Sequence, residues 1–183
     1  MKHEIVIAGF GGQGVLSMGM TLAYAGMLEN KEVSWMPSYG PEMRGGTANC
    51  TVIISDQPVS SPILNSFDIA VVLNQPSFDK FQPTVKPNGF LLYEQDQIFN
   101  SDCRQEIHAI GISATKEAHA LKNKRAMNMI MLGALLGTNA IVDIPSVINA
   151  LKKVLPERHH HLLPLNEQAI RKGQGIIHQV AEV

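Results

Sequence analysis

Cysteine is scarce in this sequence: Cys50 and Cys103 are the only two among 183 residues, and they lie far apart. Two isolated cysteines exclude a disulfide framework and are expected to be reduced thiols, as in a cytoplasmic protein. A chain of this length buries on the order of 70% of the surface that its unfolded form exposes, so its fold needs no disulfide or metal for stability.

Charge of one sign is also lacking. The formal net charge is −1, and no stretch carries five like charges in a row, which argues against nucleic acid and anionic membranes as partners. The most apolar run, residues 126–137 (AMNMIMLGALLG), is too short to cross a bilayer and contains Asn128. No apolar signal-peptide region follows the opening MKHE, so we expect a soluble, cytoplasmic protein.

The first half of the chain contains short apolar runs that are typical of strands. Residues 5–8 form a continuous apolar run that ends at glycines, the pattern of a strand buried on both faces. Apolar residues at helical spacing follow, so a strand, a glycine turn and a helix open the domain. Further strands are predicted at 33–36 (stopped by Pro37), 47–55, 68–73 and 89–93, with one short helix at 76–85, ended by Pro83.

The second half is predicted to be helical, with helices at 115–121, 125–136, 145–154 and 165–180. Ser113 is a candidate cap for the first of these, and Pro145 suits the first turn of the third. Gly173 and Gly175 should loosen the last. Strands early and helices late predict a single domain, residues 1–183, with a three-layer α/β/α Rossmann-like fold and helical additions in the C-terminal half.

The pattern G-x-G-x-x-G at residues 9–14 (GFGGQG) lies directly after the first predicted strand and before a helix. In a dinucleotide-binding fold the first glycine makes the tight turn, the second lets the backbone approach a pyrophosphate, and the third lets the helix pack on the strand. Free amides at the helix N-terminus would hold the anion. Gln13 either donates to a ligand or caps the helix. The candidate cofactor-binding residues here are Gly9, Gly11, Gly12, Gln13 and Gly14.

An NAD(P) site would need one more residue, which this sequence lacks. About 20 residues on, the second strand should end in an acid that bonds the adenosine ribose. The strand at 33–36 ends in Pro37, and no arginine for a 2′-phosphate lies nearby. Three interpretations stay open: glycines that bind NAD(P), glycines needed only for a tight turn, or glycine amides that meet another phosphate-bearing or partner-derived group.

The segment 38–50 (SYGPEMRGGTANC) contains more charged residues and glycines than a connection between two strands requires. Glu42 and Arg44 either form a local ion pair on a solvated turn, or support a site in which the Arg44 guanidinium meets a phosphate, a carboxylate or a charged group of a partner. Gly45 and Gly46 would then allow close backbone approach. Arg44, Gly45 and Gly46 are therefore further candidate cofactor-binding residues.

Taken together, GFGGQGV at 9–15 and PEMRGG at 41–46 resemble the gamma subunit of the 2-oxoacid:ferredoxin oxidoreductases, thiamine-diphosphate enzymes that oxidise 2-oxoacids to acyl-CoA. The resemblance covers almost the whole chain. It includes the Ser-Pro-Ile segment at 61–63 and the asparagine, Asn128, of the later apolar helix. The sequence SYGPEMRGGTANC of this segment is most similar to the gamma chains of 2-oxoglutarate enzymes.

The resemblance implies an α/β subunit of a larger enzyme that converts a 2-oxoacid, coenzyme A and oxidised ferredoxin to acyl-CoA, carbon dioxide and reduced ferredoxin. It implies alpha and beta subunits that hold thiamine diphosphate and Mg, and a ferredoxin-like delta subunit or domain with iron–sulfur clusters. The gamma-type domain is associated with closing over the site and with coenzyme A. Since a cluster typically needs four cysteines, this chain is expected to bind no cofactor alone and to be inactive in isolation.

Two other functions stay open: a free-standing NAD(P)-dependent oxidoreductase and a non-catalytic α/β scaffold module. The isolated chain is also a candidate homodimer through its apolar helix. Asn128 is expected to be a satisfied buried amide, and residues 61–63 a structural turn. The histidine run 159–161 is expected in a surface loop, because adjacent histidines do not converge on a metal. Tyr39 either contacts a neighbouring chain or covers the sheet edge.

Overall fold

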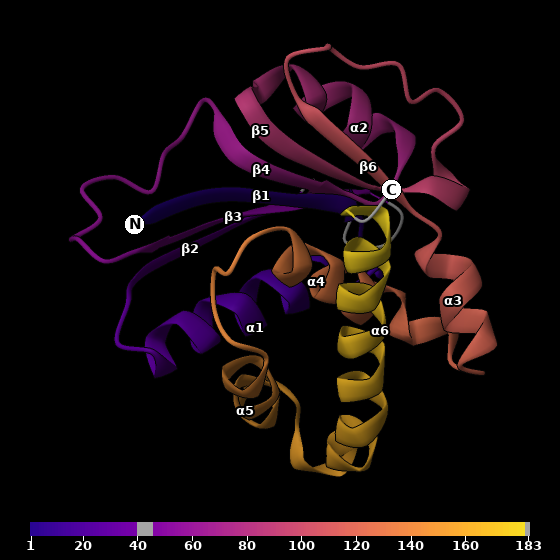
Figure 1. The fold of residues 1–183 in the computed structure, drawn as a ribbon. Coiled ribbons are helices and arrows are strands. Elements are labelled where there is room, and N and C mark those ends of the chain that lie inside the picture. The colour runs from indigo at the N-terminus through magenta and orange to yellow at the C-terminus, as the bar shows by residue number, and fades with distance from the viewer. Residues whose placement is uncertain (40–45, 182–183) are drawn as a thin grey trace.

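The computed structural model describes residues 1–39 and 46–181, arranged around one six-stranded sheet (Figure 1). Along the sheet the strands follow the order β2-β3-β1-β4-β5-β6. β1, β4, β5 and β6 run parallel, whereas β3 pairs antiparallel with both β1 and β2. The strands are β1 (Lys2–Phe10), β2 (Glu32–Tyr39), β3 (Thr47–Ser55), β4 (Phe67–Val72), β5 (Val85–Glu94) and β6 (His108–Ile112).

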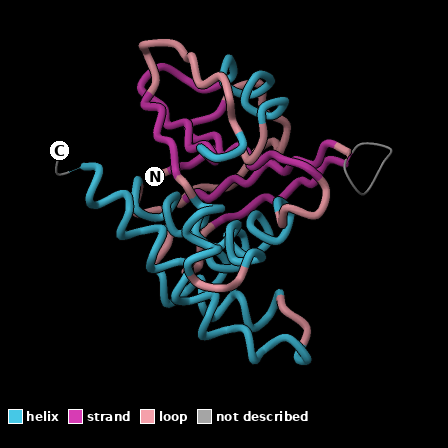
Figure 2. Tube along the Cα trace, turned by 90° about the vertical axis from the view of Figure 1, so that its right-hand side faces the viewer, coloured by secondary structure: helices cyan, strands magenta, loops and turns pink. Residues whose placement is uncertain are grey.

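Helices cover the two faces of the sheet unequally. In Figure 1, α1, α4, α5 and α6 lie below the sheet, α3 lies at the side of that layer, and α2 lies above the sheet. Figure 2 shows the same imbalance from the side. The predicted three-layer α/β fold with helical additions is confirmed. The helical layer above the sheet, formed by α2, is thin. The helices are α1 (Val15–Leu28), α2 (Gln75–Phe81), α3 (Ala114–Ala120), α4 (Met127–Thr138), α5 (Ile144–Val154) and α6 (Leu163–Ala181).

Strand β1 is buried on both faces and separates two hydrophobic cores. Ile5 and Ile7 belong to the larger core, which α1, α4, α5 and α6 cover, while Val6 and Ala8 belong to the smaller core under α2. All four side chains are fully buried. Because successive side chains of a strand point to opposite faces, a continuous apolar run serves both cores. The strand predicted at residues 5–8 is confirmed.

Strand β2 is longer than predicted. Pro37 was expected to stop it, but β2 continues to Tyr39, with Pro37 opposite Cys50 of β3. β2 is an edge strand, and an edge strand tolerates proline because the missing N–H need not pair with a further strand. The short edge strand β6 was not predicted.

The last helix is not loosened by its glycines. A Cβ added to Gly173 of α6 would lie 1.9 Å from the carbonyl oxygen of Ile130, and one added to Gly133 of α4 would lie 1.9 Å from that of Ile170. The two glycines therefore let the backbones of α4 and α6 touch. Gly175 has nothing within 4 Å of its Cβ position. The prediction of a loosened helix is wrong, because only Gly173 faces the neighbouring helix, and there it permits close packing.

Helix starts are set partly by residues distant in sequence. Ser113 precedes α3 but makes no side-chain capping bond. Instead, Glu94 Oε1 at the end of β5 accepts from the Thr115 N–H at 3.0 Å. The start of α5 is confirmed, with Pro145 in its first turn. Among the described residues no helix is both long and apolar enough to span a bilayer.

Candidate functional site: the glycine loop and its cavities

The glycine loop, residues 9–14, lies where β1 ends and α1 begins, at the carboxyl end of the parallel strands. From there α1 passes below the sheet, whereas α2, which follows the neighbouring strand β4, passes above it (Figure 1). A divergence of this kind between adjacent parallel strands is a topological switch point, where open α/β sheets bind ligands. The fold therefore places the predicted loop at a position suited to a binding site.

Gln13 links the ends of the two diverging strands. Its Oε1 accepts from the Phe10 N–H at 2.6 Å, and its Nε2 donates to the Leu73 carbonyl at 3.3 Å. Asn74 lies beside it, with Nδ2 3.5 Å from the same Oε1. Both polar ends of Gln13 are thus engaged within the protein. The side chain does not cap α1, and it acts as a positioning residue between β1 and β4, while its predicted contact with a ligand stays a prediction.

The glycines of the loop have different roles. Gly9 still belongs to β1, opposite Ala48 of β3, so it does not make the turn as predicted; a Cβ there would lie 2.6 Å from Gln13 Oε1, so Gly9 makes room for that side chain. Gly12 has a φ of +99° and nothing within 4 Å of its Cβ position, so its backbone is open to a ligand. Gly14 has a φ of +81°, and its Cβ would lie 2.2 Å from Asn128 Nδ2. It therefore makes room for α4, and not for the strand as predicted.

The second motif lies directly beside this loop. The Gly11 N–H donates to the Gly46 carbonyl at 2.9 Å, so the amide of the second glycine is used within the protein. Glu42, Arg44 and Gly45 lie outside the described residues. The structure thus brings Gly46, the last residue of the second motif, to the glycine loop.

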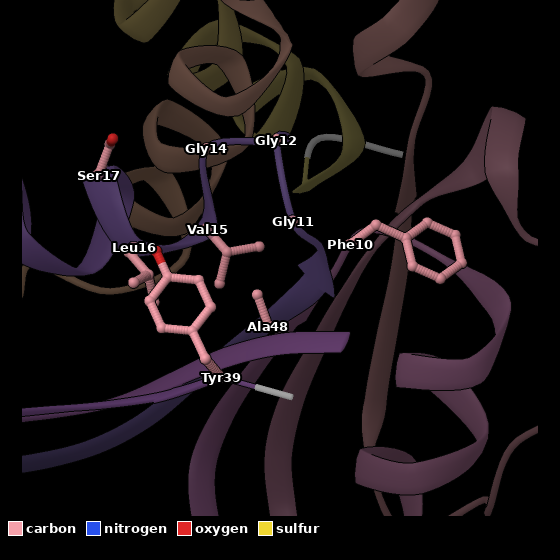
Figure 3. A pocket seen from close by; sticks show the side chains of 9 residues that line it. All are labelled: Phe10, Gly11, Gly12, Gly14, Val15, Leu16, Ser17, Tyr39 and Ala48. Carbon is pink, nitrogen blue, oxygen red and sulfur yellow. The ribbon is translucent and has the colours of Figure 1, made fainter. Parts of the chain in front are cut away.

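One side of the glycine loop borders a cavity of about 280 Å³, which we call the loop cavity. The Tyr39 ring lies beside Val15 and Leu16 in it, whereas the Phe10 ring points away (Figure 3). Tyr39 is 53% exposed. Its side chain borders the cavity and leaves an apolar surface open at the end of β2, so it does more than cover the sheet edge.

The other side borders a cavity of about 400 Å³ toward α4, which we call the basic cavity. Gly12 and Gly14 line it together with Lys124, Arg125 and Asn128. Asn128 is half-buried and makes no hydrogen bond among the described residues, so it is not the satisfied buried amide that we expected. The 3₁₀ turn Lys124–Ala126 and the first turn of α4 thus present two cations and the Asn128 amide to the glycine loop.

These groups favour an anion. The first N–H groups of a helix have no partner within it and carry the positive end of the helix dipole. Here the N-terminus of α1 lies close to the side chains of Lys124 and Arg125. In the described part of the chain, neither cavity is lined by a histidine, carboxylate or thiol. The described groups are of the kind that bind a phosphate.

Lys124 and Arg125 were not predicted as site residues. The only available signal is the basic segment KNKR before the apolar helix. More than 100 residues separate this segment from the glycine loop, so their proximity depends on how α4 packs against the start of α1.

An NAD(P) site is further disfavoured by the sheet order. In a dinucleotide-binding fold the second strand lies beside the first and supplies the ribose acid, but here β3 lies between β1 and β2. The end of β2 is therefore displaced by one strand from the position at which an acid could reach an adenosine ribose.

The remaining candidates of the sequence lie elsewhere. The Ser61 Oγ accepts from the Ile63 N–H at 3.1 Å, which confirms the predicted turn. The histidine run lies in a 3₁₀ helix, Glu157–Leu162, and not in a loop. His160 Nε2 lies 2.9 Å from the Leu155 carbonyl and His161 Nδ1 3.0 Å from the Arg158 carbonyl, so local hydrogen bonds fix this helix.

Comparison with known proteins agrees with this geometry. The family model described as pyruvate ferredoxin/flavodoxin oxidoreductase matches residues 4–176. The ketoisovalerate oxidoreductase subunit VorA of Methanothermobacter thermautotrophicus is 46% identical over 133 residues, which cover 73% of this chain and 28% of that protein. The 2-oxoglutarate synthase subunit KorC of Methanocaldococcus jannaschii is 35% identical over 160 residues, 86% of each chain. The chain thus spans under a third of the first relative and most of the second.

Solved structures share the fold over nearly the full chain. The gamma subunit of a keto/oxoacid ferredoxin oxidoreductase from Geobacter sulfurreducens has a TM-score of 0.80 and 26% identity, covering 94% of this chain and 96% of that one. A 2-oxoglutarate:ferredoxin oxidoreductase from Magnetococcus marinus, solved with 2-oxoglutarate, coenzyme A and succinyl-CoA, has a TM-score of 0.89 and 24% identity, covering 97% and 31%. This chain belongs to the pyruvate ferredoxin/flavodoxin oxidoreductase family.

Proposed function

We propose that this chain is the gamma subunit of a cytoplasmic 2-oxoacid:ferredoxin oxidoreductase and that its glycine loop binds the phosphate groups of coenzyme A. The family match and the gamma-subunit fold support the first part. The second part rests on the basic cavity, where the backbone at Gly12 and the start of α1 lie close to Lys124 and Arg125.

Coenzyme A carries a diphosphate that suits this cavity. Backbone amides at a helix N-terminus and cationic side chains are the usual partners of phosphate oxygens. The Asn128 amide offers a further donor close to Gly14. The related Magnetococcus structure was solved with coenzyme A bound, which supports the choice of this ligand.

The remaining cofactors of the reaction belong to other subunits in this proposal. An iron–sulfur cluster typically takes four cysteine thiolates, and this chain has only Cys50, which is fully buried, and Cys103. The cysteines do not fit a cluster. Alpha and beta subunits would hold thiamine diphosphate and Mg, and a ferredoxin-like delta subunit would pass electrons to ferredoxin. This chain would bind and orient coenzyme A next to that site.

We propose 2-oxoglutarate as the oxidised substrate. The match to a 2-oxoglutarate synthase subunit over 86% of each chain supports it, as does the sequence of the segment 38–50. The ketoisovalerate subunit is more identical over a shorter stretch. Purified complex given 2-oxoglutarate, pyruvate and 3-methyl-2-oxobutanoate in turn should reduce ferredoxin fastest with the first, and a faster reaction with another acid would refute this choice.

The coenzyme A proposal is tested in the reconstituted complex with the double change Lys124→Gln and Arg125→Gln. Loss of two charge-assisted hydrogen bonds should raise the KM for coenzyme A by roughly 10-fold or more, with little change in the KM for the 2-oxoacid. The matched control is Lys152→Gln with Lys153→Gln, an exposed basic pair at the end of α5. An unchanged KM for coenzyme A in the first variant would contradict the proposal.

Arg44 is tested separately because its surroundings lie outside the described residues. Arg44→Ala in the same complex is expected to slow coenzyme-A-dependent ferredoxin reduction, since the glycine loop and Gly46 are adjacent. A rate equal to that of the unmodified complex would show that Arg44 and its neighbour Glu42 form only a local ion pair.

A further inference from the structure

A larger cavity of about 640 Å³ lies among the helices below the sheet, between α1, α4, α5 and the start of α6. We call it the helical cavity. Arg125 and Asn128 line both this cavity and the basic cavity. The two spaces therefore adjoin at these residues, and a ligand held by its phosphates at the glycine loop can extend past them into the helical layer.

The walls of the helical cavity are mostly apolar, and its rim is polar. Met129 comes from α4 and Leu151 from α5, and Leu155 directly follows α5. Lys122 and Asn123 precede α4 at the rim. Apolar walls with a few polar groups are typical of sites that hold a flat organic group. No acidic side chain lines this cavity in the described part of the chain.

Thr21 gives an independent sign that a polar group is missing. It lines the cavity from α1, it is completely buried, and its hydroxyl has no hydrogen-bond partner among the described residues. Most buried side-chain polar atoms in proteins have a partner, and one left without a partner destabilises the fold. Ser17, one turn earlier on the same face of α1, lines the cavity as well.

We infer that the helical cavity holds the nucleoside end of coenzyme A, its adenosine 3′-phosphate, an inference that rests on the proposed function. The adenine ring would lie against Met129, Leu151 and Leu155. The Thr21 hydroxyl would supply or accept one hydrogen bond. The 3′-phosphate would meet the Lys122 ammonium group at the rim, while the diphosphate stays in the basic cavity.

The charges around the cavity agree with this assignment. Lys122 and Arg125 are its two permanent cations, which matches the two anionic parts of coenzyme A, the 3′-phosphate and the diphosphate. His159 and His161 also line it from the 3₁₀ helix. A neutral apolar ligand would leave all of these donors unused, so a nucleoside with a phosphate fits better.

The test measures equilibrium binding to the assembled complex with three probes: coenzyme A, dephospho-coenzyme A, which lacks the 3′-phosphate, and 4′-phosphopantetheine, which lacks the whole nucleotide. Leu155→Trp, which fills the cavity, should weaken coenzyme A at least about 10-fold and leave 4′-phosphopantetheine within twofold. Lys122→Gln should weaken coenzyme A by about 5-fold and leave dephospho-coenzyme A unchanged. Leu28→Trp, at an exposed position on α1, is the control.

Thr21→Val is a nearly isosteric second variant that keeps the packing. It should weaken coenzyme A by about 3- to 10-fold, the loss of one hydrogen bond. If coenzyme A binds with equal affinity to the unmodified, Leu155→Trp and Thr21→Val complexes, this inference is overturned while the proposed function stands. If the Lys124 and Arg125 variant above also binds coenzyme A normally, the proposed function fails with it.

Discussion

Gly133 of α4 and Gly173 of α6 face each other's helices so closely that a Cβ on either would lie 1.9 Å from a backbone carbonyl of the other helix. The carbonyls belong to Ile170 and Ile130, three residues before each glycine. This crossing fixes α6 against α4, and α4 in turn brings Asn128 to Gly14. Packing of the C-terminal helices therefore determines the shape of the candidate site.

Alanine at either crossing glycine should destabilise the protein. Gly133→Ala and Gly173→Ala place a methyl group against backbone that can move only with its helix, and we expect a loss of about 2–3 kcal/mol in the free energy of unfolding. Gly175→Ala is the matched control, since nothing lies near its Cβ position, and it should gain up to about 1 kcal/mol from helix propensity. Urea denaturation of the three variants measures this, and equal stabilities would contradict the crossing.

The two cysteines should differ sharply in reactivity. Burial raises the pKa of the Cys50 thiol to about 12, so only about 1 thiol in 10⁴ is ionised at pH 8. Cys103 is only half-buried. With iodoacetamide at pH 8, mass spectrometry should find Cys103 modified in the folded chain and Cys50 modified only after denaturant is added. Modification of Cys50 in the native protein would show that the core around it opens.

Glu94 should make stability depend on pH. Burial raises the pKa of its carboxyl, and nearby Asp96 adds to this, although the Thr115 amide opposes it. A carboxyl whose pKa is higher in the folded state than in the unfolded state stabilises the fold below the unfolded value, near 4.5, and that stability is lost as pH rises through the folded pKa. Glu94→Gln should therefore gain stability relative to the unmodified protein between pH 5 and pH 8.

Two comparisons separate this effect from capping. Glu94→Ala also removes the acceptor of the Thr115 N–H and should therefore be about 1 kcal/mol less stable than Glu94→Gln at every pH. Asp56→Asn should show the opposite pH trend, because hydrogen bonds from Lys31 and the N-terminal amine lower the pKa of Asp56 to about 2. The stability that Asp56→Asn loses relative to the unmodified protein should therefore shrink as pH falls toward that value. Thermal unfolding from pH 3 to pH 8 tests all three variants.

Gln13 should act on coenzyme A through the glycine loop and not by contact. Gln13→Leu leaves the Phe10 N–H and the Leu73 carbonyl without their partner, and we expect the KM for coenzyme A to rise several-fold in the complex while the KM for the 2-oxoacid stays constant. Gln13→Glu, which keeps the acceptor for Phe10, should restore part of the affinity. Gln97→Leu, at an exposed position, serves as the control, and equal effects on both KM values would indicate a general structural role.

Most strands and helices could be predicted from local patterns. The run at 5–8 is continuous and apolar because β1 is covered on both faces, and Pro145 marks the start of α5 because proline suits a first helical turn. Pro37 misled the prediction of β2, since the position of a strand at the sheet edge cannot be read from its own residues. For the same reason the short edge strand β6 was missed.

The sequence by itself determined the fold class and the family, because glycine turns, apolar periodicity and the GFGGQG and EMRGG motifs are local properties of the chain. Only the tertiary structure decided what surrounds the glycine loop. In that structure Gln13 donates to the Leu73 carbonyl, and Gly14 packs against Asn128 of α4. Lys124, Arg125 and Thr21 line adjoining cavities. These contacts join residues more than 50 positions apart, and they depend on helix packing that no local pattern encodes.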